Sequence, residues 1–113
     1  MKSDSPAHVE LLRGTLDLLI LRTLLSGPAH GHAVAKHIQR TSEDLLQVET
    51  GSLYPALHRL EERGWIQAEW GVSDTNRKAK FYSLTKAGRK HLAAEESRFT
   101  QLANAIARVL RST

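Results

Sequence analysis

Leucines at helical spacing dominate the first predicted element, which runs from Glu10 to Ser26. Its apolar residues form two stripes, one with Leu12, Leu16, Leu19, Ile20 and Leu24 and the other with Leu11, Leu18, Leu21 and Leu25. A helix that is apolar on two faces is either deeply buried or shared with a second molecule. Because the chain is short, the shared arrangement is attractive, and we expect the second stripe to contact another copy. The preceding residues, 1–9, are mostly small or polar and predict a flexible tail.

A second, shorter helix and a connector come next. The Ser-Gly-Pro run at 26–28 ends the first helix, because proline cannot continue it and glycine favours a turn. Val34 and Ile38 lie four positions apart and predict a helix over residues 31–40. Residues 41–49 mix acids and polar residues with a few apolar ones and predict a turn or brief connection.

The stretch from Thr50 to Gly64 predicts a third helix, with a buried stripe of leucines at positions 53, 57 and 60. Gly51 and Ser52 are expected to supply its entry, and Pro55 is expected in its first turn, where the missing N–H is not needed. Gly64 is expected to close the helix in the left-handed conformation. Two short helices joined by a connector in this way are typical of a helix-turn-helix unit.

The outer face of this third helix is predicted to be polar. It carries Ser52, Tyr54, Ala56, His58 and Arg59. Hydroxyl, imidazole and guanidinium groups are those that contact base edges and phosphates, and an arginine can make a bidentate contact with guanine. Any amphipathic surface helix has a polar face, however, so this pattern needs support from its context.

A β-hairpin is predicted after the third helix. Residues 65–70 and 80–84 have strand-favouring composition, and residues 71–79 between them are rich in turn-forming and basic residues. The tip carries Arg77, Lys78 and Lys80. A hairpin that follows a helix-turn-helix in this way is a wing, and its alternative interpretation is a solvated basic turn.

The last element is a helix from Lys86 to about Arg111, with Thr85 as its N-cap. Its length is roughly 39 Å, more than a small domain needs to cover itself. Apolar residues recur at coiled-coil spacing along it, at Leu92, Phe99, Leu102, Ile106 and Val109. We therefore expect a dimerisation helix packed on the same domain; the alternative is a core helix folded back on its own domain.

Taken together, the elements predict a mainly α fold with a small β-hairpin wing, in which a winged helix-turn-helix over residues 10–85 is followed by a dimerisation helix over 86–113. The chain has 113 residues, a formal net charge of +4 and a pI of about 9.8, which favours polyanions without proving that it binds them. It has no cysteine, no apolar run long enough for a membrane span and no signal peptide, so we expect a cytoplasmic protein.

Enzymatic and metal chemistry find little support in the residues. Adjacent glutamates on a helix diverge by about 100°, so neither Glu pair, at 61–62 or 95–96, converges on a substrate. Histidines at 30, 32 and 37 lack a cysteine or nearby carboxylate to complete a zinc site. Trp65 and Trp70 could line a pocket but are usually packing residues in such a strand. We expect no enzyme activity, no metal and no cofactor.

Three runs of residues together resemble the PadR-type winged-helix transcriptional regulators. These runs are Gly51-Ser52-Leu53-Tyr54-Pro55-Ala56-Leu57-His58-Arg59-Leu60-Glu61, then Gly64-Trp65-Ile66, then Phe81-Tyr82-Ser83-Leu84-Thr85-Lys86-Ala87-Gly88. The resemblance extends to Arg13-Gly14-Thr15-Leu16-Asp17 and to the turn at 27–32, where His32 replaces a tyrosine common in the family. The single C-terminal helix is similar to that of the shorter members.

The resemblance implies a homodimeric bacterial repressor that binds an inverted-repeat operator in double-stranded DNA. By motif position it places Thr50, Gly51, Ser52, Tyr54, Pro55, His58 and Arg59 at the DNA, with Arg77, Lys78 and Lys80 as wing contacts. Some relatives respond to small aromatic ligands, so an aromatic effector is a further possible partner. Two other functions stay open on the sequence: a winged helix that binds protein partners, and a ligand-sensing dimer with an indirect role at DNA. The operator, the regulated genes and the choice between repressor and activator are not encoded in any motif.

Overall fold

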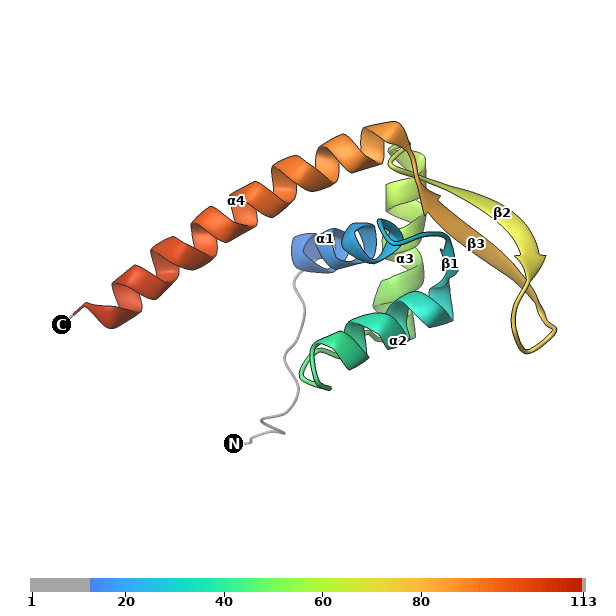
Figure 1. Ribbon diagram of the computed structural model, residues 1–113, viewed down its shortest axis with the longest axis horizontal. Helices are drawn as coiled ribbons and strands as arrows, with labels where there is room; N and C mark the ends of the chain where they lie inside the picture. Colours follow the sequence, from blue (N-terminus) through green and yellow to red (C-terminus); the bar gives the residue numbers. More distant parts are fainter. Residues whose placement is uncertain (1–12, 113) are drawn as a thin grey trace.

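The computed structural model describes residues 13–112, in which four helices and a small sheet are arranged as a winged helix (Figure 1). The elements are α1 (Arg13–Leu24), β1 (Ala29–His30), α2 (Gly31–Thr41), α3 (Thr50–Glu62), β2 (Ile66–Val72), β3 (Lys78–Leu84) and α4 (Lys86–Arg111). The predicted tail and Leu11 lie outside the described residues. No helix in the described part of the chain is long and apolar enough to cross a membrane.

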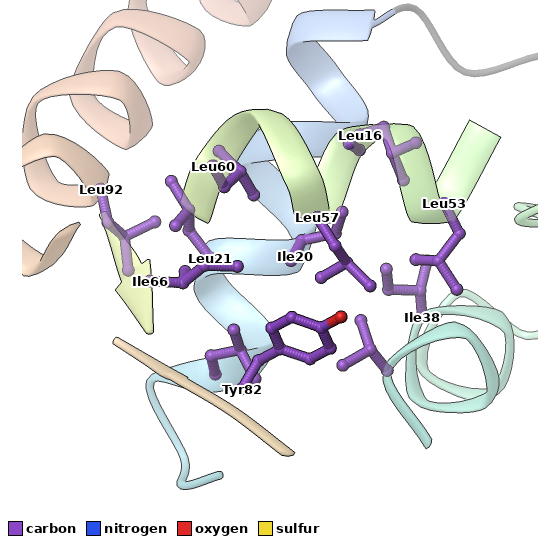
Figure 2. Packing of buried hydrophobic residues seen from close by; sticks show 13 residues of the cluster. Leu16, Ile20, Leu21, Ile38, Leu53, Leu57, Leu60, Ile66, Tyr82 and Leu92 are labelled. Atoms are coloured by element: carbon purple, nitrogen blue, oxygen red, sulfur yellow. The ribbon is translucent and has the colours of Figure 1, made fainter. Parts of the chain in front are cut away.

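The core lies where α1, α2 and α3 meet the base of the sheet (Figure 2). Leu53, Leu57 and Leu60 of α3 are all buried, as their spacing predicted, and they pack with Ile20 of α1 and Ile38 of α2. Three helices converge here because each has one apolar stripe to remove from water, and burying a leucine side chain contributes about 1.5–3 kcal/mol. The buried stripe of α3 therefore fixes which of its residues face outward.

The sheet has three strands in the order β1-β3-β2, all antiparallel. The hairpin of β2 and β3 was predicted, but β1 was not. Its two residues pair with β3, Ala29 opposite Tyr82 and His30 opposite Phe81. A two-residue strand has no periodicity to detect, and only its partner makes it a strand. This pairing attaches the base of the wing to the turn before α2.

The entry of α3 differs from the prediction. The helix begins at Thr50 with Glu49 as its N-cap residue, and the backbone N–H groups of Ser52 and Leu53 both donate to the Glu49 carbonyl, at 3.0 and 2.9 Å. Pro55 therefore lies inside the helix and not in its first turn. The turn before Pro55 stays helical because Leu53 is anchored in the core, at 3% exposure. Gly64 closes the helix with φ +77°, as predicted.

Helix α4 starts at a close contact with the beginning of the hairpin. The Thr85 hydroxyl accepts a hydrogen bond from the Gly88 N–H (3.0 Å) and donates to the Gly64 carbonyl (2.6 Å), which confirms Thr85 as the cap. A Cβ on Gly88 would lie 1.9 Å from the Trp65 carbonyl oxygen, so only glycine permits this approach. Within α4 the buried residues are Gly88 and Leu92. The remainder of α4 projects away from the body of the molecule, and the alternative of a helix folded back on its own domain does not hold (Figure 1).

Gly88→Ala is expected to destabilise the protein by about 3 kcal/mol or more, because the added methyl group overlaps a backbone atom that cannot move without shifting β2. Urea unfolding measures the loss. Gly14→Ala is the matched control: nothing lies within 4 Å of its added Cβ, and in a helix the change stabilises by roughly 0.5–1 kcal/mol. Equal stability of Gly88→Ala and the parent would contradict the close contact.

Candidate nucleic-acid interface

The first half of α3 presents a continuous exposed polar surface. Its exposed residues include Thr50, Gly51, Ser52, Tyr54, Pro55 and His58. All six belong to the set predicted from the sequence, and the structure brings them together on one side of the helix because the leucines hold the other side in the core. Ala56 was expected on this face as well, but it is fully buried, at 0% exposure. At 100° per residue it lies beside Leu60, at the edge of the leucine stripe, so the buried side of α3 is wider than the leucines alone predicted.

Arg59 does not share this surface. Its guanidinium Nη2 donates to Oδ1 of Asp17 on α1 at 2.7 Å, and the two side chains are each only 23% exposed. In this protomer one guanidinium nitrogen is therefore engaged by a carboxylate. The pair joins α3 to α1, which the sequence did not predict, and the base contact expected of Arg59 stays a prediction. The residues are 42 positions apart, so no local pattern could reveal the pair.

His58 is the next polar group along α3, and it remains on the outer surface. Its Nε2 lies 3.4 Å from Oε2 of Glu62, one turn later, and both side chains are about two-thirds exposed or more. An exposed pair of this kind contributes little to stability, typically well under about 1 kcal/mol. The imidazole is therefore available to a partner at low energetic cost.

The ring of Tyr54 lies against the first residue of α2. A Cβ added to Gly31 would come within 2.9 Å of the Tyr54 hydroxyl oxygen and within 3.0–3.1 Å of two ring carbons. The phenol therefore leans across the N-terminus of α2 while the side chain stays 48% exposed. Gly31 is buried because this ring covers it. The contact holds the Tyr54 hydroxyl at the junction of the two helices of the helix-turn-helix.

The wing carries its positive charge at and behind the tip. Arg77 and Lys78 are exposed, and no ion pair involves either of them within residues 13–112. The Lys78 ammonium lies 5.8 Å from the centre of the Trp70 ring. Lys80 lies further back: its ammonium is 3.6 Å from Glu61 on α3 and 5.9 Å from the centre of the Tyr82 ring. Arg77 and Lys78 are therefore the free cations of the predicted wing set, whereas Lys80 also ties the wing to α3.

An open groove with a volume of about 790 Å³ has the wing on one side and the start of α2, with Tyr54 of α3, on the other. Its lining includes Tyr54, Trp70, Tyr82 and the three basic residues of the wing. Burial raises the pKa of the Tyr82 hydroxyl above its ordinary value, and the nearby Glu61 and Tyr54 raise it further.

Basic residues of α2 extend the surface on the other side of the wing tip. Lys36, His37 and Arg40 are exposed and line a hollow of about 460 Å³, which Asp74 and Thr75 of the wing loop close. None of the three was predicted as a site residue from the sequence. The available signal was their spacing, since Arg40 follows His37 and Lys36 by three and four residues, and residues at these spacings share one face of a helix.

The histidines at 30 and 32 serve local structure and surface. His30 is the N-cap of α2, where its Nδ1 accepts a hydrogen bond from the Ala33 N–H at 3.2 Å. Its ring meets Phe81 edge-on and stacks loosely on His32, with ring centres 6.4 Å apart. Among the described residues no group of three or more His, Asp or Glu side chains could hold a metal ion.

The residues predicted for dimerisation divide into two groups. Leu21 and Leu92 are buried in the core of the protomer, at 1% and 3% exposure, so neither forms an interface as predicted. They are buried because α1 and the start of α4 pack on each other. Leu18 is half-buried, and the remaining predicted residues are exposed, namely Leu25, Phe99, Leu102, Ile106 and Val109. Together with Leu110, which is 79% exposed, the last four form an apolar stripe along the projecting part of α4.

A cavity of about 390 Å³ lies between α1, the end of α3 and α4. The Asp17–Arg59 pair forms part of its wall, with Trp65 and His91 beside it. The rings of Trp65 and His91 stack at 3.5 Å between centres, and the Arg63 guanidinium lies 5.3 Å from the Trp65 ring centre.

The three-helix core, the exposed polar half of α3 and the basic hairpin beside it define a winged helix-turn-helix protein of the class that binds DNA. Residues 20–94 match the family model described as "Transcriptional regulator PadR-like family". This match covers more than half of the chain, which therefore belongs to the PadR-like family of transcriptional regulators. The family is one of regulators and not of enzymes.

Individual relatives agree with this assignment. The chain is 32% identical over 97 residues to the transcriptional regulator Rv3488 of Mycobacterium tuberculosis, covering 86% of this chain and 87% of that protein. A PadR family transcriptional regulator from Eggerthella lenta matches with a TM-score of 0.75 at 30% identity, covering 89% and 86% of the two chains. A transcriptional regulator from Clostridium thermocellum matches with a TM-score of 0.77 at 27% identity, covering 85% and 93%.

The Asp17–Arg59 pair generates a test of where Arg59 acts. In a double-mutant cycle of Asp17→Ala and Arg59→Ala, followed by urea unfolding, we expect a coupling free energy of about 1 kcal/mol, because the pair is only 23% exposed. The exposed His58–Glu62 pair is the matched control and should give a coupling near zero. A coupling free energy of zero for Asp17 and Arg59 would show that the ion pair does not hold Arg59, whose guanidinium would then be available to a binding partner.

Proposed function

We propose that this chain is a sequence-specific DNA-binding repressor that acts as a homodimer on an inverted-repeat operator. The observation that carries the proposal is the position of the exposed half of α3 beside a basic wing. A helix of this kind fits the major groove of B-DNA, and a basic hairpin beside it reaches the neighbouring backbone. The family assignment supports the same function.

We assign each exposed residue of α3 and the wing a role at DNA from its position and its chemistry. Ser52 and the Tyr54 hydroxyl can donate hydrogen bonds to phosphates and so set the register of the helix. His58 and Thr50, both exposed on α3, are the candidates for base edges. Arg77 and Lys78 neutralise phosphates and add affinity. Pro55 and Gly51 offer a surface free of long side chains, which allows the helix to approach the bases closely.

Homodimerisation is proposed on the apolar stripe of α4. Phe99, Leu102 and Ile106 are 45–56% exposed, and their three- and four-residue spacing is that of a coiled-coil seam. An exposed stripe of this kind on a helix that projects from its own domain is most simply covered by the same stripe of a second copy. A two-fold dimer would present two α3 helices to an operator with the same symmetry.

A small aromatic effector stays a prediction from the sequence. The cavity beside Trp65 and His91 offers aromatic walls, and the Asp17–Arg59 pair in its wall connects it to α3. A ligand there would lie next to the helix that is proposed to read DNA.

Binding to DNA from upstream of the protein's own gene, measured by gel shift or fluorescence anisotropy over a salt series, tests the proposal. Between 50 and 200 mM salt the affinity should fall by roughly a thousandfold if about six phosphates are neutralised. In Arg77→Ala the slope of log K against log salt should shrink by about two, roughly 0.9 for each copy of the wing. Arg108→Ala, on the projecting part of α4, is the control and should leave the slope unchanged. A salt-independent interaction would favour the protein-binding alternative and contradict the proposal.

A second prediction concerns the dimer. Leu102→Glu combined with Ile106→Glu should give monomers in light scattering, because four glutamates would otherwise be buried in one seam. Operator binding should be lost with the dimer, since two recognition helices must be held about 34 Å apart. Gln101→Glu combined with Asn104→Glu places the same charge on the opposite face of α4 and should leave the dimer intact. If the dimer survives the first pair of substitutions, its interface lies elsewhere on the protein.

A further inference from the structure

The wing exposes two large apolar side chains that the fold does not use. Trp70 is 63% exposed and Val72 is 65% exposed. Strand alternation places them on the same face of the hairpin as Ile66 and Ala68, which pack against the core. The hairpin extends beyond the body of the protein, so this apolar face continues past the last element that could cover it (Figure 1). Of the two interpretations that the sequence left open for Trp70, packing or lining a pocket, its exposure and its place in the groove favour the second.

The face with Trp70 is one wall of the groove between α3 and the wing, and Tyr54 belongs to the lining from α3. The Lys78 ammonium lies close to the Trp70 ring, 5.8 Å from its centre, yet most of the indole surface remains open to the groove. Arg77 also lines it, as do Ser73, Asp74 and Thr75 of the wing loop and His30 and His32 at the start of α2. The groove thus combines aromatic walls with cations and hydroxyl groups, and it carries one carboxylate, that of Asp74.

The position of this groove determines what can occupy it when the protein is on DNA. If α3 lies in a major groove and the wing reaches the adjacent minor groove, one sugar-phosphate strand separates the two grooves and must pass between α3 and the wing. A DNA strand alternates deoxyribose rings, whose C–H surfaces are apolar, with anionic phosphates. Aromatic walls interrupted by cations match this alternation, whereas a purely basic groove would match only the phosphates.

We propose that the groove between α3 and the wing holds one sugar-phosphate strand of the operator, with Trp70 packed on a deoxyribose ring while Arg77 and Lys78 neutralise the flanking phosphates. The proposal rests on the proposed function and deepens it, because it gives the wing an apolar contact in addition to its charge. Trp70 is then a positioning residue for the wing. It holds the hairpin at a fixed depth against the strand, which a flexible lysine cannot do alone.

The apolar and electrostatic contacts have different signatures in a salt series. Removing a phosphate contact reduces the slope of log K against log salt, because fewer counterions are released. Removing an apolar contact lowers the affinity at every salt concentration and leaves the slope unchanged. Trp70→Ala should therefore weaken operator binding by at least about tenfold, or about 1.4 kcal/mol, with the parental slope, whereas Arg77→Ala should change the slope.

Two further variants test whether a loss of affinity in Trp70→Ala comes only from damage to the hairpin. Trp70→Leu keeps an apolar side chain and should bind within about threefold of the parent, which is about half, in free energy, of the tenfold loss expected for Trp70→Ala. Gln67→Ala alters an exposed residue of the same strand on the opposite face and should leave the affinity unchanged. Fluorescence gives an independent measurement: operator DNA should change the emission of the parent, and this change should be lost in Trp70→Phe, where Trp65 is the remaining tryptophan.

Three results would overturn the inference. If Trp70→Ala binds operator DNA with the parental affinity, or if it reduces the salt slope as Arg77→Ala does, the proposed apolar contact is wrong. A planar aromatic compound that quenches Trp70 and competes with operator DNA would make the groove a small-ligand site. Each of these leaves the proposed function standing, because the parent still binds the operator. Failure of the parent to bind DNA at all would instead refute the proposed function itself.

Discussion

The contact between Gly88 and the Trp65 carbonyl determines how the two halves of this molecule relate. Trp65 directly follows the turn that ends α3, and Gly88 lies in the first turn of α4. A backbone-to-backbone approach of this kind leaves no side chain that could adjust by changing its rotamer, so the direction of α4 is set by the path of the chain itself. The Thr85 side chain adds a second constraint, because its one hydroxyl both caps α4 and donates to the Gly64 carbonyl. The helix α3, the hairpin of β2 and β3, and the helix α4 therefore all meet at this one joint.

The division of α3 into a buried and an exposed side follows from the same packing. Its three leucines fix the rotation of the helix about its axis, and the Asp17–Arg59 pair fixes it again from the side of α1. Lys80 reaches Glu61 from the third direction, the wing. With its rotation held from three sides, α3 presents Ser52, Tyr54 and His58 in one orientation, which is the preorganisation that a DNA-reading helix needs.

The sequence predicted the elements far better than it predicted the partners of individual side chains. The α4 helix, its Thr85 cap and the closing Gly64 were all predicted, because caps and periodicity act over a few residues. The partner of Arg59 and the strand β1 were missed for a common reason, because each depends on a residue that is distant in the sequence. Arg59 looks like a free cation until Asp17 is placed beside it, and Ala29 becomes a strand residue only through Tyr82. Leu21 and Leu92 also fit the interface pattern in the sequence, but in the structure both side chains are buried in the core of the protomer.

In the proposed dimer these constraints have a combined consequence. The seam on α4 would set the distance between two protomers, and the joint at Gly88 would transmit that distance to each α3 without a flexible linker. The spacing of the two reading helices would then be a property of the backbone, and a change at the seam would move them together. The Asp17–Arg59 pair differs in kind, because it is a side-chain contact in the wall of a cavity and can be broken without unfolding the joint. The Asp17–Arg59 pair is therefore an easier contact to alter than the backbone joint that would set the spacing of the two helices.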